Sequence, residues 1–365
     1  MQRAISLTLN SDSDLIATIK EFNSVCNFCL KKGMKTKTYN KLKLHHSTYK
    51  TIRRKSKLQS SLVQCARDQA SEMLKREKLK RLPVKKEYSA IRYNQRTFSF
   101  NLKTNQISLS SINGRKKIKL NIPNYFKKYS LNKIVLSTLS FKNKKLHLKL
   151  IIDIETPTKL KVKSVLGIDR GIINPIVTSN NKFYNSRKIR TIKGKYQYLK
   201  SHLQAKGTKS AKRHLKKISG REKRFITNIN HILAKEVVNM NYEAFAIETL
   251  TIKKQKKLGK KFNKALGRWS YGQFQRFLEY KAENLGKTVV CIDPRYTSQC
   301  CSNCGEIRRA NRKGKIYICN KCGYSLNADL NASKNIAELG KAFFSRLPVN
   351  QPIVTSLNKA QLQAT

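Results

Sequence analysis

The chain of 365 residues carries 78 Lys and Arg against 20 Asp and Glu, a formal net charge of +58 at pH 7. A folded protein with this charge repels itself unless a polyanion offsets it, which argues against most metabolic enzymes and indicates RNA or DNA as the partner. Hydrophobic residues make up 39% of the chain, so cores can form, and the length suits roughly two or three domains.

The sequence shows no membrane or secretion signal. No apolar run reaches the ~20 residues that a membrane-spanning helix needs, and the first residues lack the apolar segment of a signal peptide. The nine cysteines fall mostly in one short region at metal-ligand spacing, which fits a reducing compartment. We therefore expect a soluble cytoplasmic protein of a prokaryote or virus.

The first half of the chain predicts a β module with inserted helices, an α+β arrangement. Residues 3–9 alternate like a strand, and the SDSD tract that follows is typical of a helix cap. Apolar residues then recur at helical spacing within residues 11–83. From about residue 88 the period changes to two, with polar turns between short segments. We expect a small sheet or barrel formed by residues 1–10 and 84–160.

The second half alternates strands and helices, so we predict an α/β domain. Its predicted strands span residues 165–169, 176–180, 244–250 and 287–294, and its predicted helices span residues 230–241 and 272–286.

Between the first two of these strands and the helix at 230–241, residues 187–224 predict a basic helical hairpin. A lysine-rich helical face is often only solvated surface, but in a chain of this charge we favour contact with nucleic-acid phosphates. The residues that we expect to make it are Arg187, Arg190, Lys193, Lys195, Lys212, Arg213, Lys216, Lys217, Arg221 and Arg224.

Two Cys-x2-Cys pairs predict a zinc site. Cys301 and Cys304 are followed, after fourteen residues, by Cys319 and Cys322, and a glycine follows each pair. Four thiolates in two tight turns can close a tetrahedron around a structural Zn²⁺, the alternative being a metal-free or disulfide-bonded loop. Cys300 gives the wrong spacing, so we expect a spare thiol there. A further pair, Cys26 and Cys29, lies in an amphipathic pattern, where we expect core residues.

Carboxylates are rare in this chain, so those that end apolar strands need a reason to be there. Asp169 ends the tract VLGID, Glu248 ends AFAIE, and Asp329 begins an Ala-rich helical tract after the cysteines. Carboxylates on neighbouring strand ends can hold Mg²⁺. If the helix packs beside the strand ends, all three meet.

Each acid also has an alternative role. Asp169 can be a turn residue paired with Arg170, Glu248 a salt-bridge partner, and Asp329 a helix cap. Other acids, at positions 153, 155 and 293, also follow apolar runs. The pattern of burial alone therefore leaves the choice open.

The order of these features resembles the TnpB (OrfB) proteins of insertion sequences, which are compact RNA-guided nucleases related to miniature type V CRISPR effectors. The resemblance is close from about residue 160 to 345. The family tract TSQxCSxCG is matched by Thr297, Ser298, Gln299, Cys301, Ser302, Cys304 and Gly305. Two positions depart from it, Cys300 where a non-cysteine is expected and Asn327 where many relatives have an acid.

The resemblance implies a fold and domain order. A β-barrel wedge domain (1–10 and 84–160) would carry a helical recognition domain (11–83). A RuvC-like nuclease domain of RNase H-like fold (161–299) would follow, with the zinc ribbon (300–324) inserted before the helix of the third motif (325–345). A disordered tail (346–365) would end the chain.

The resemblance also implies a function. The protein would be a transposon-encoded, RNA-guided DNA endonuclease, often labelled transposase, that cuts guide-matched double-stranded DNA beside a short motif. Asp169, Glu248 and Asp329 would hold two catalytic Mg²⁺ ions, Cys301, Cys304, Cys319 and Cys322 a structural Zn²⁺, and a guide RNA would derive from the end of the element. A nucleoid-associated location and a homodimer are compatible with this function.

Three alternatives stay open. A nuclease-inactive or weakly active RNA-guided repressor would keep the fold and the RNA. A miniature CRISPR effector would differ only in its genomic locus. A basic zinc-ribbon RNA-binding protein would need neither strand-terminal acids nor a guide.

Overall fold

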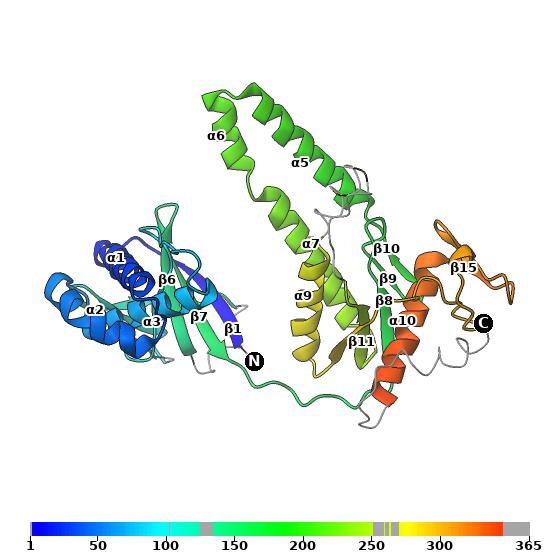
Figure 1. The fold of residues 1–365 in the computed structure, drawn as a ribbon, viewed down its shortest axis with the longest axis horizontal. Helices are drawn as coiled ribbons and strands as arrows, with labels where there is room; N and C mark the ends of the chain where they lie inside the picture. The colour runs from blue at the N-terminus through cyan, green and yellow to red at the C-terminus, as the bar shows by residue number, and fades with distance from the viewer. Residues whose placement is uncertain are drawn as a thin grey trace. The chain divides into compact units, whose positions relative to one another are not determined.

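The computed structural model describes residues 2–101, 103–124, 134–250, 259, 263 and 270–345. The chain divides into two compact units, Met1–Glu155 and Thr156–Thr365, which we take separately (Figure 1). The predicted tail, residues 346–365, lies outside the described residues. In the part of the chain that is described, no helix is long and apolar enough to cross a membrane.

The first unit contains two antiparallel sheets. Strand β1 joins the first sheet along its whole length, from the pair of Gln2 with Asp153 to the pair of Leu9 with Leu146, which confirms that the initial strand belongs to the β module. The sheets have the order β1-β7-β6-β2 and β3-β4-β5. The strands are β1 (Gln2–Leu9), β2 (Ile91–Tyr93), β3 (Phe98–Asn101), β4 (Gln106–Ser111), β5 (Gly114–Lys119), β6 (Ile134–Lys142) and β7 (Lys145–Asp153). Closure into a barrel stays a prediction.

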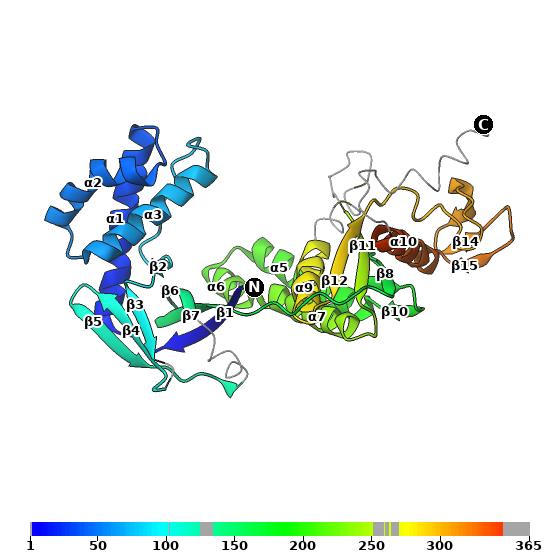
Figure 2. The same cartoon turned by 90° about the horizontal axis from the view of Figure 1, so that it is seen from below.

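Three helices, α1 (Ser13–Lys35), α2 (Lys41–Lys55) and α3 (Ser60–Arg76), are inserted between β1 and β2 (Figure 2). The predicted cap is confirmed, because the Asp12 side chain accepts a hydrogen bond from the Leu15 N–H at 2.9 Å. The sequence pattern missed α2 because its buried positions are few. Helices and sheets share one hydrophobic cluster.

The second unit is built on a five-stranded sheet with the order β10-β9-β8-β11-β12. Its strands are β8 (Val165–Asp169), β9 (Ile176–Thr178), β10 (Lys182–Tyr184), β11 (Ala244–Glu248) and β12 (Thr288–Ile292). Strands β8, β11 and β12 are parallel, whereas β8, β9 and β10 form antiparallel pairs. The predicted strands are thus confirmed: β8 has the predicted bounds, and β9, β11 and β12 are each slightly shorter than predicted.

Helices cover both faces of this sheet (Figures 1 and 2). In β11, Phe245 and Ile247 face α7 (Arg221–Val238) and α9 (Tyr271–Glu283), while Ala244 and Ala246 face α10 (Ala328–Ser345). Alternate side chains of a strand point to opposite faces, so both of these faces are apolar and the strand is buried on both sides.

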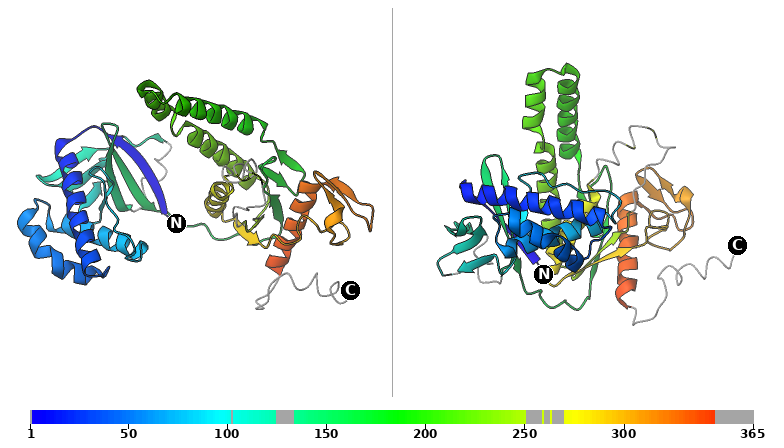
Figure 3. Two further views of the ribbon diagram at one scale, coloured as in Figure 1. Left: turned by 45° about the horizontal axis from the view of Figure 1, so that its top comes forward. Right: turned by 60° about the vertical axis from the view of Figure 1, so that its left-hand side comes forward.

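The basic hairpin differs from its prediction at its second arm. The arm is helix α6 (Lys209–Ile218), which follows α5 (Arg187–Lys206) and ends before Gly220. Gly220 adopts the left-handed region with φ of 81°, and α7 then runs unbroken from Arg221. The separate helix predicted at 230–241 is therefore wrong in its start, because the first turn of α7 is charged and most of its buried residues lie from Asn230 onward. Arms α5 and α6 project from the sheet (Figure 3).

The cysteine segment forms a small three-stranded sheet before α10. Its strands β13 (Arg312–Lys313), β14 (Ile316–Ile318) and β15 (Ser325–Asn327) are antiparallel. Tyr317 is fully buried against Cys301 and Cys319. This ribbon and α10 are continuous in the chain, so the ribbon lies directly before Asp329.

Candidate functional site

Two of the predicted acids lie at the same edge of the five-stranded sheet. Asp169 is the last residue of β8 and Glu248 the last of β11. The parallel register pairs Ile168 with Ile247, so the two acids follow as the next pair. In open α/β sheets, ligands bind outside the carboxyl ends of the strands, which is the edge that these acids occupy.

Close packing of α10 brings the third acid to this edge. A Cβ at Gly167 would overlap the backbone of Ser333 and Ala337, and one at Gly340 would come within 2.8 Å of Val165. Helix α10 is therefore antiparallel to β8: Gly340 lies beside Val165 at the start of the strand, and the first turn of the helix lies toward Asp169 at its end. That turn holds Asp329. The glycines thus set the helix position that places Asp329 near the strand ends.

The three carboxylates interact electrostatically. Burial, together with the negative charges of Glu248 and then Asp329, raises the pKa of Asp169 to about 7. Burial also raises the pKa of Glu248, against a hydrogen bond from Thr297 that lowers it. Like charges close together in a partly buried place are costly unless a cation accompanies them.

The structure does not show the alternative roles of Asp169 and Asp329. Among the described residues, Asp169 forms no ion pair with Arg170, whose guanidinium instead donates to Gln275 Oε1 at 3.2 Å and to the carbonyl of Glu248. The helix cap is Asn327, whose Oδ1 accepts from the N–H of Asp329 at 3.0 Å. Asn327, which departs from the family pattern, thus leaves the Asp329 carboxylate to other partners.

Three side chains contact the acids directly. The Thr297 hydroxyl donates to Glu248 Oε1 at 2.5 Å. Asn174 Nδ2 donates to Asp329 Oδ2 at 3.1 Å, and Arg312 Nη2 lies 3.3 Å from Asp329 Oδ1. Sequence reasoning placed Thr297 only in the cysteine tract and missed Asn174 and Arg312. Asn174 belongs to the turn after Asp169, whereas Arg312 carries no signal beyond its charge.

The structure gathers the four predicted cysteines of the ribbon. The Sγ atoms of Cys301, Cys304, Cys319 and Cys322 all lie within 4.8 Å of one another. The glycines after each pair, Gly305 and Gly323, have φ of 77° and 71°, a left-handed region that favours glycine. Four thiols on two such turns fit a tetrahedral Zn²⁺.

Cys300 lies apart from this group. Its Sγ donates to the carbonyl of Gly305 at 3.5 Å, and burial raises its pKa to about 11. At Cys322, by contrast, the backbone N–H of Tyr324 lowers the pKa of the thiol. Cys300 is thus set apart by position, because its sulfur is not one of the four that lie within 4.8 Å of one another.

The predicted phosphate contacts lie on three helices. All ten except the half-buried Lys193 are exposed, and no residue of α5 is buried. On α5 lie Arg187, Arg190, Lys193 and Lys195, on α6 Lys212, Arg213, Lys216 and Lys217, and on α7 Arg221 and Arg224. Lys200 forms an ion pair with Glu222 at 2.6 Å that ties α5 to α7.

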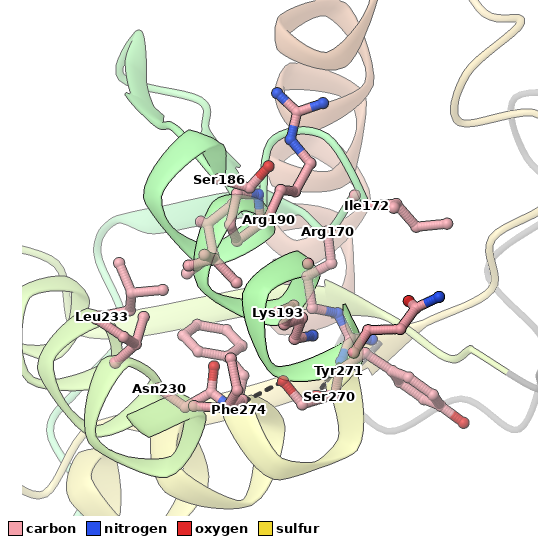
Figure 4. A pocket seen from close by; sticks show the side chains of 18 residues that line it. Arg170, Ile172, Ser186, Arg190, Lys193, Asn230, Leu233, Ser270, Tyr271 and Phe274 are labelled. Carbon is pink, nitrogen blue, oxygen red and sulfur yellow. Dashed lines mark hydrogen bonds between the residues drawn. The ribbon is translucent and has the colours of Figure 1, made fainter. Parts of the chain in front are cut away.

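A cavity of about 260 Å³, which the sequence did not predict, lies between α5, α7, α9 and the turn after β8 (Figure 4). Its walls are mostly apolar, with Phe274 and Leu233 among them, and Arg190 and Lys193 line it from α5. Arg170 joins the cavity to the acidic edge, because it also binds the carbonyl of Glu248.

Two family models match the chain. A probable transposase family, OrfB of the IS605 type, matches residues 149–259, and the Cas12f1-like TNB domain matches residues 271–336. These ranges include Asp169, Glu248, Asp329 and the cysteine ribbon.

Curated proteins that are similar to this chain are named Cas12f1 or TnpB-like. A CRISPR-associated endodeoxyribonuclease Cas12f1 of Syntrophomonas palmitatica is 27% identical over 231 residues, 49% of this chain and 46% of that protein. A TnpB-like protein of Methanocaldococcus jannaschii is 31% identical over 127 residues, 33% of this chain and 45% of that protein. The chain thus matches less than half the length of each of these relatives.

The fold also has a solved counterpart. A Cas12f1 chain in a complex with sgRNA and target DNA aligns with a TM-score of 0.63 at 15% identity, covering 89% of this chain and 82% of that chain. This likeness shows a shared fold of mixed helices and strands. The two family models and the curated relatives show that the chain is similar to the TnpB (OrfB) proteins and to the Cas12f1 nucleases.

Proposed function

We propose that the chain is an RNA-guided DNA endonuclease that hydrolyses phosphodiester bonds with Mg²⁺. The observation that carries this proposal is the Asp169 carboxylate. It is placed at a sheet edge with Glu248 and Asp329, and both neighbours raise its pKa. In a chain with a net charge of +58, an acidic site of this kind is most readily explained by cation binding.

We assign the five-stranded sheet to the RNase H-like (RuvC-like) nuclease fold. An antiparallel β10-β9-β8 arrangement followed by parallel β11 and β12 supports this assignment, together with the resemblance of the motifs. The nuclease domain would span residues 161–299, with the ribbon at 300–324 and the third motif in the helix at 325–345. The first unit would supply the wedge (1–10 and 84–160) and recognition (11–83) domains.

The acids have the chemistry to hold Mg²⁺, which prefers carboxylate oxygens. Asp169, Glu248 and Asp329 would be the residues that hold the ions. When bound there, Mg²⁺ would supply activation of the attacking water and stabilisation of the leaving 3′ oxygen. Asn174 and Thr297 would orient the outer carboxylates through the hydrogen bonds described above. The cysteine ribbon would hold Zn²⁺ as a closed, structural site.

The nucleic acid would be a guide RNA and a double-stranded DNA target. The solved Cas12f1 complex contains an sgRNA and target DNA, which supports this assignment by analogy. Helices α5 and α6 would contact the phosphate backbone, because their exposed cations lie on arms that project from the sheet (Figure 3). Base pairing with the guide would supply the sequence specificity. A homodimer and a cytoplasmic, nucleoid-associated location stay predictions.

The test is cleavage of a DNA library by the protein purified with its own RNA. The protein is expressed with its native flanking DNA, the bound RNA is sequenced, and a matching plasmid library is incubated with Mg²⁺ or with EDTA. We expect guide-matched cutting beside one short motif, abolished by EDTA. A bound guide without cutting would indicate a repressor, and no discrete RNA a general RNA-binding protein.

Asp169→Asn separates metal ligation from folding in this assay, because it keeps the shape of the side chain and removes its charge. We expect cleavage to fall by at least about 100-fold with RNA binding unchanged, as for loss of a metal-bound catalytic group. Asp153→Asn is the matched control, since Asp153 also ends a strand, β7, but lies in the other unit. Retained cleavage by Asp169→Asn would contradict the proposal.

A further inference from the structure

Thr297 links the acidic edge to the cysteine ribbon. Its side chain is buried, and its hydroxyl donates to Glu248 Oε1 at 2.5 Å. A second acceptor, the carbonyl of Pro294, lies 3.0 Å from the same hydroxyl. A hydroxyl has one proton, and the shorter contact to a charged acceptor is the stronger one. Among the described residues, Glu248 Oε2 accepts no hydrogen bond, so Thr297 takes one carboxylate oxygen and leaves the other available to a cation.

Helix α10 holds Thr297 from the other side. Asn335 Nδ2 donates to the carbonyl of Thr297 at 2.8 Å and to the carbonyl of Cys300 at 2.7 Å. Asn335 is 7% exposed and Thr297 3% exposed, so these bonds lie away from competing water. A buried amide that satisfies two carbonyls fixes the backbone between them. The segment from Thr297 to Cys300 is thus tied to the helix that carries Asp329.

One turn earlier on α10, Asn331 forms hydrogen bonds to the first cysteine turn. Its Nδ2 donates to the carbonyl of Cys300 at 2.7 Å, and its Oδ1 accepts from the N–H of Ser302 at 3.0 Å. Cys301, between these two positions, belongs to the cysteine cluster. Asn331 and Asn335 therefore join the ribbon, Thr297 and the Asp329 helix in one continuous hydrogen-bonded path, which explains the asparagines that follow Asp329 in the sequence.

We infer that Thr297, held by Asn335, is a positioning residue that orients the Glu248 carboxylate for cation binding and so couples the cysteine ribbon to the acidic edge. This inference rests on the proposed metal site, but it assigns a role to side chains that touch no substrate. Glu248 ends β11 and Asp329 lies in the first turn of α10, and the path through Thr297 and Asn335 fixes one relative to the other. Side chains that orient metal ligands in this way commonly alter metal affinity when they are removed.

The test measures cation binding directly. Mn²⁺, a spectroscopic substitute for Mg²⁺, is titrated into the full chain with its bound RNA, with the Asp169→Asn variant defining binding at the acidic edge. Thr297→Val keeps the shape and removes the hydroxyl, and we expect it to weaken this binding by about 10- to 100-fold. Thr297→Ser retains the hydroxyl and should bind within about 3-fold of the parent, a rescue that a purely structural role would not require.

Two further readouts separate orientation from damage. Zinc content of Thr297→Val should equal that of the parent, because the cysteines are unchanged. Thr178→Val is the matched control: Thr178 is also fully buried in this unit, and its hydroxyl donates to Asn180 Oδ1 at 2.6 Å and not to an acid. We expect it to leave Mn²⁺ affinity unchanged even if it lowers stability.

Asn335→Leu tests the coupling. We expect Asn335→Leu to weaken Mn²⁺ binding as well. The double variant with Thr297→Val should lose less affinity than the product of the two single fold-losses, because residues in one hydrogen-bonded network act non-additively. Parental Mn²⁺ affinity in Thr297→Val, loss of its zinc, or fully multiplicative effects would each overturn the inference. If the parent and Asp169→Asn bind Mn²⁺ alike, the proposed metal site itself fails, which is a separate and recognisable result.

Discussion

The two units bury their cysteines in opposite ways. In the first unit, Cys26 and Cys29 lie on the core face of α1 and are fully buried in the hydrophobic cluster, where burial raises the pKa of Cys26 to about 12 and that of Cys29 to about 11. In the ribbon, four thiols meet on two turns that end in left-handed glycines. The same Cys-x2-Cys spacing thus gives neutral core residues on a helix and a candidate metal site on turns.

The carboxylates follow the same principle. Carboxylates placed close together are stabilised by a cation, and four thiols on two turns can bind one, whereas single polar groups in a core need only stay neutral or paired. Lys85 shows the second case: its Nζ donates to Gln69 Oε1 at 2.8 Å and to the carbonyl of Ala90 at 2.7 Å, and burial lowers its pKa to about 8. Substitutions in the clusters of cysteines or carboxylates should therefore have larger effects on metal binding and stability than substitutions of single buried polar groups.

The largest effect should come from Cys301→Ser. Removing one of four ligands should reduce bound zinc to near zero and unfold the ribbon, because binding of a structural zinc ion contributes about 10 kcal/mol or more to the folding of small domains. Zinc content by atomic absorption and thermal unfolding measure this. Cys300→Ser is the matched control and should keep its zinc. Zinc loss in Cys300→Ser instead would show that Cys300 is the ligand.

A smaller effect should appear in the pH dependence of the metal-free protein. The pKa of Asp169 is raised to about 7 in the folded state, so the folded state binds its proton more tightly than the unfolded chain does. Its contribution to stability is therefore present below the unfolded pKa of about 4 and is lost as the pH rises to about 7. The melting temperature should fall over this range, recover when Mg²⁺ is added at pH 8, and fall less in Asp169→Asn.

The same melting temperatures in Asp169→Asn and the parent across this range would contradict the pH prediction. EDTA keeps the metal-free samples free of Mg²⁺. Because EDTA also binds Zn²⁺, the zinc content of each sample is measured in parallel. Retained zinc assigns any recovery with Mg²⁺ to the acids and not to the ribbon.

The smallest effect should come from the isolated thiols. Cys26→Ala removes one buried sulfur from a packed cluster and should lower the free energy of unfolding by about 1 to 2 kcal/mol, the scale of a small core truncation. Zinc content should not change. Denaturant unfolding measures the first and atomic absorption the second. Zinc loss would show that the two Cys-x2-Cys environments are not as different as their structures indicate.

Local patterns predicted much of the second unit. Strands β8, β11 and β12 follow from short apolar tracts, and helix α9 from its 3.6-residue period. The cysteine spacing and the glycines after it predicted which four sulfurs gather, including the choice of Cys301 over Cys300. Patterns were weaker where apolar residues are sparse, so α2 was missed and α7 was given a late start.

Local sequence patterns did not predict which distant segments of the chain contact one another. The sequence marked Asp169, Glu248 and Asp329 as unusual acids but could not bring them to one edge. That required the parallel register of β8 with β11 and the close approach of α10, which Gly167 and Gly340 permit. Asn174, Arg312 and the path through Thr297 were equally invisible, because each bond joins residues far apart in the chain.

The sequence by itself determined the charge, the alternation of strands and helices, and the cysteine turns, because these depend on residues within a few positions of one another. Tertiary structure alone decided which neighbour each acid meets and that the ribbon contacts the acidic edge through Thr297 and Asn335. Backbone hydrogen bonds and side-chain periodicity act locally, whereas helix–sheet packing and buried hydrogen bonds depend on the whole fold.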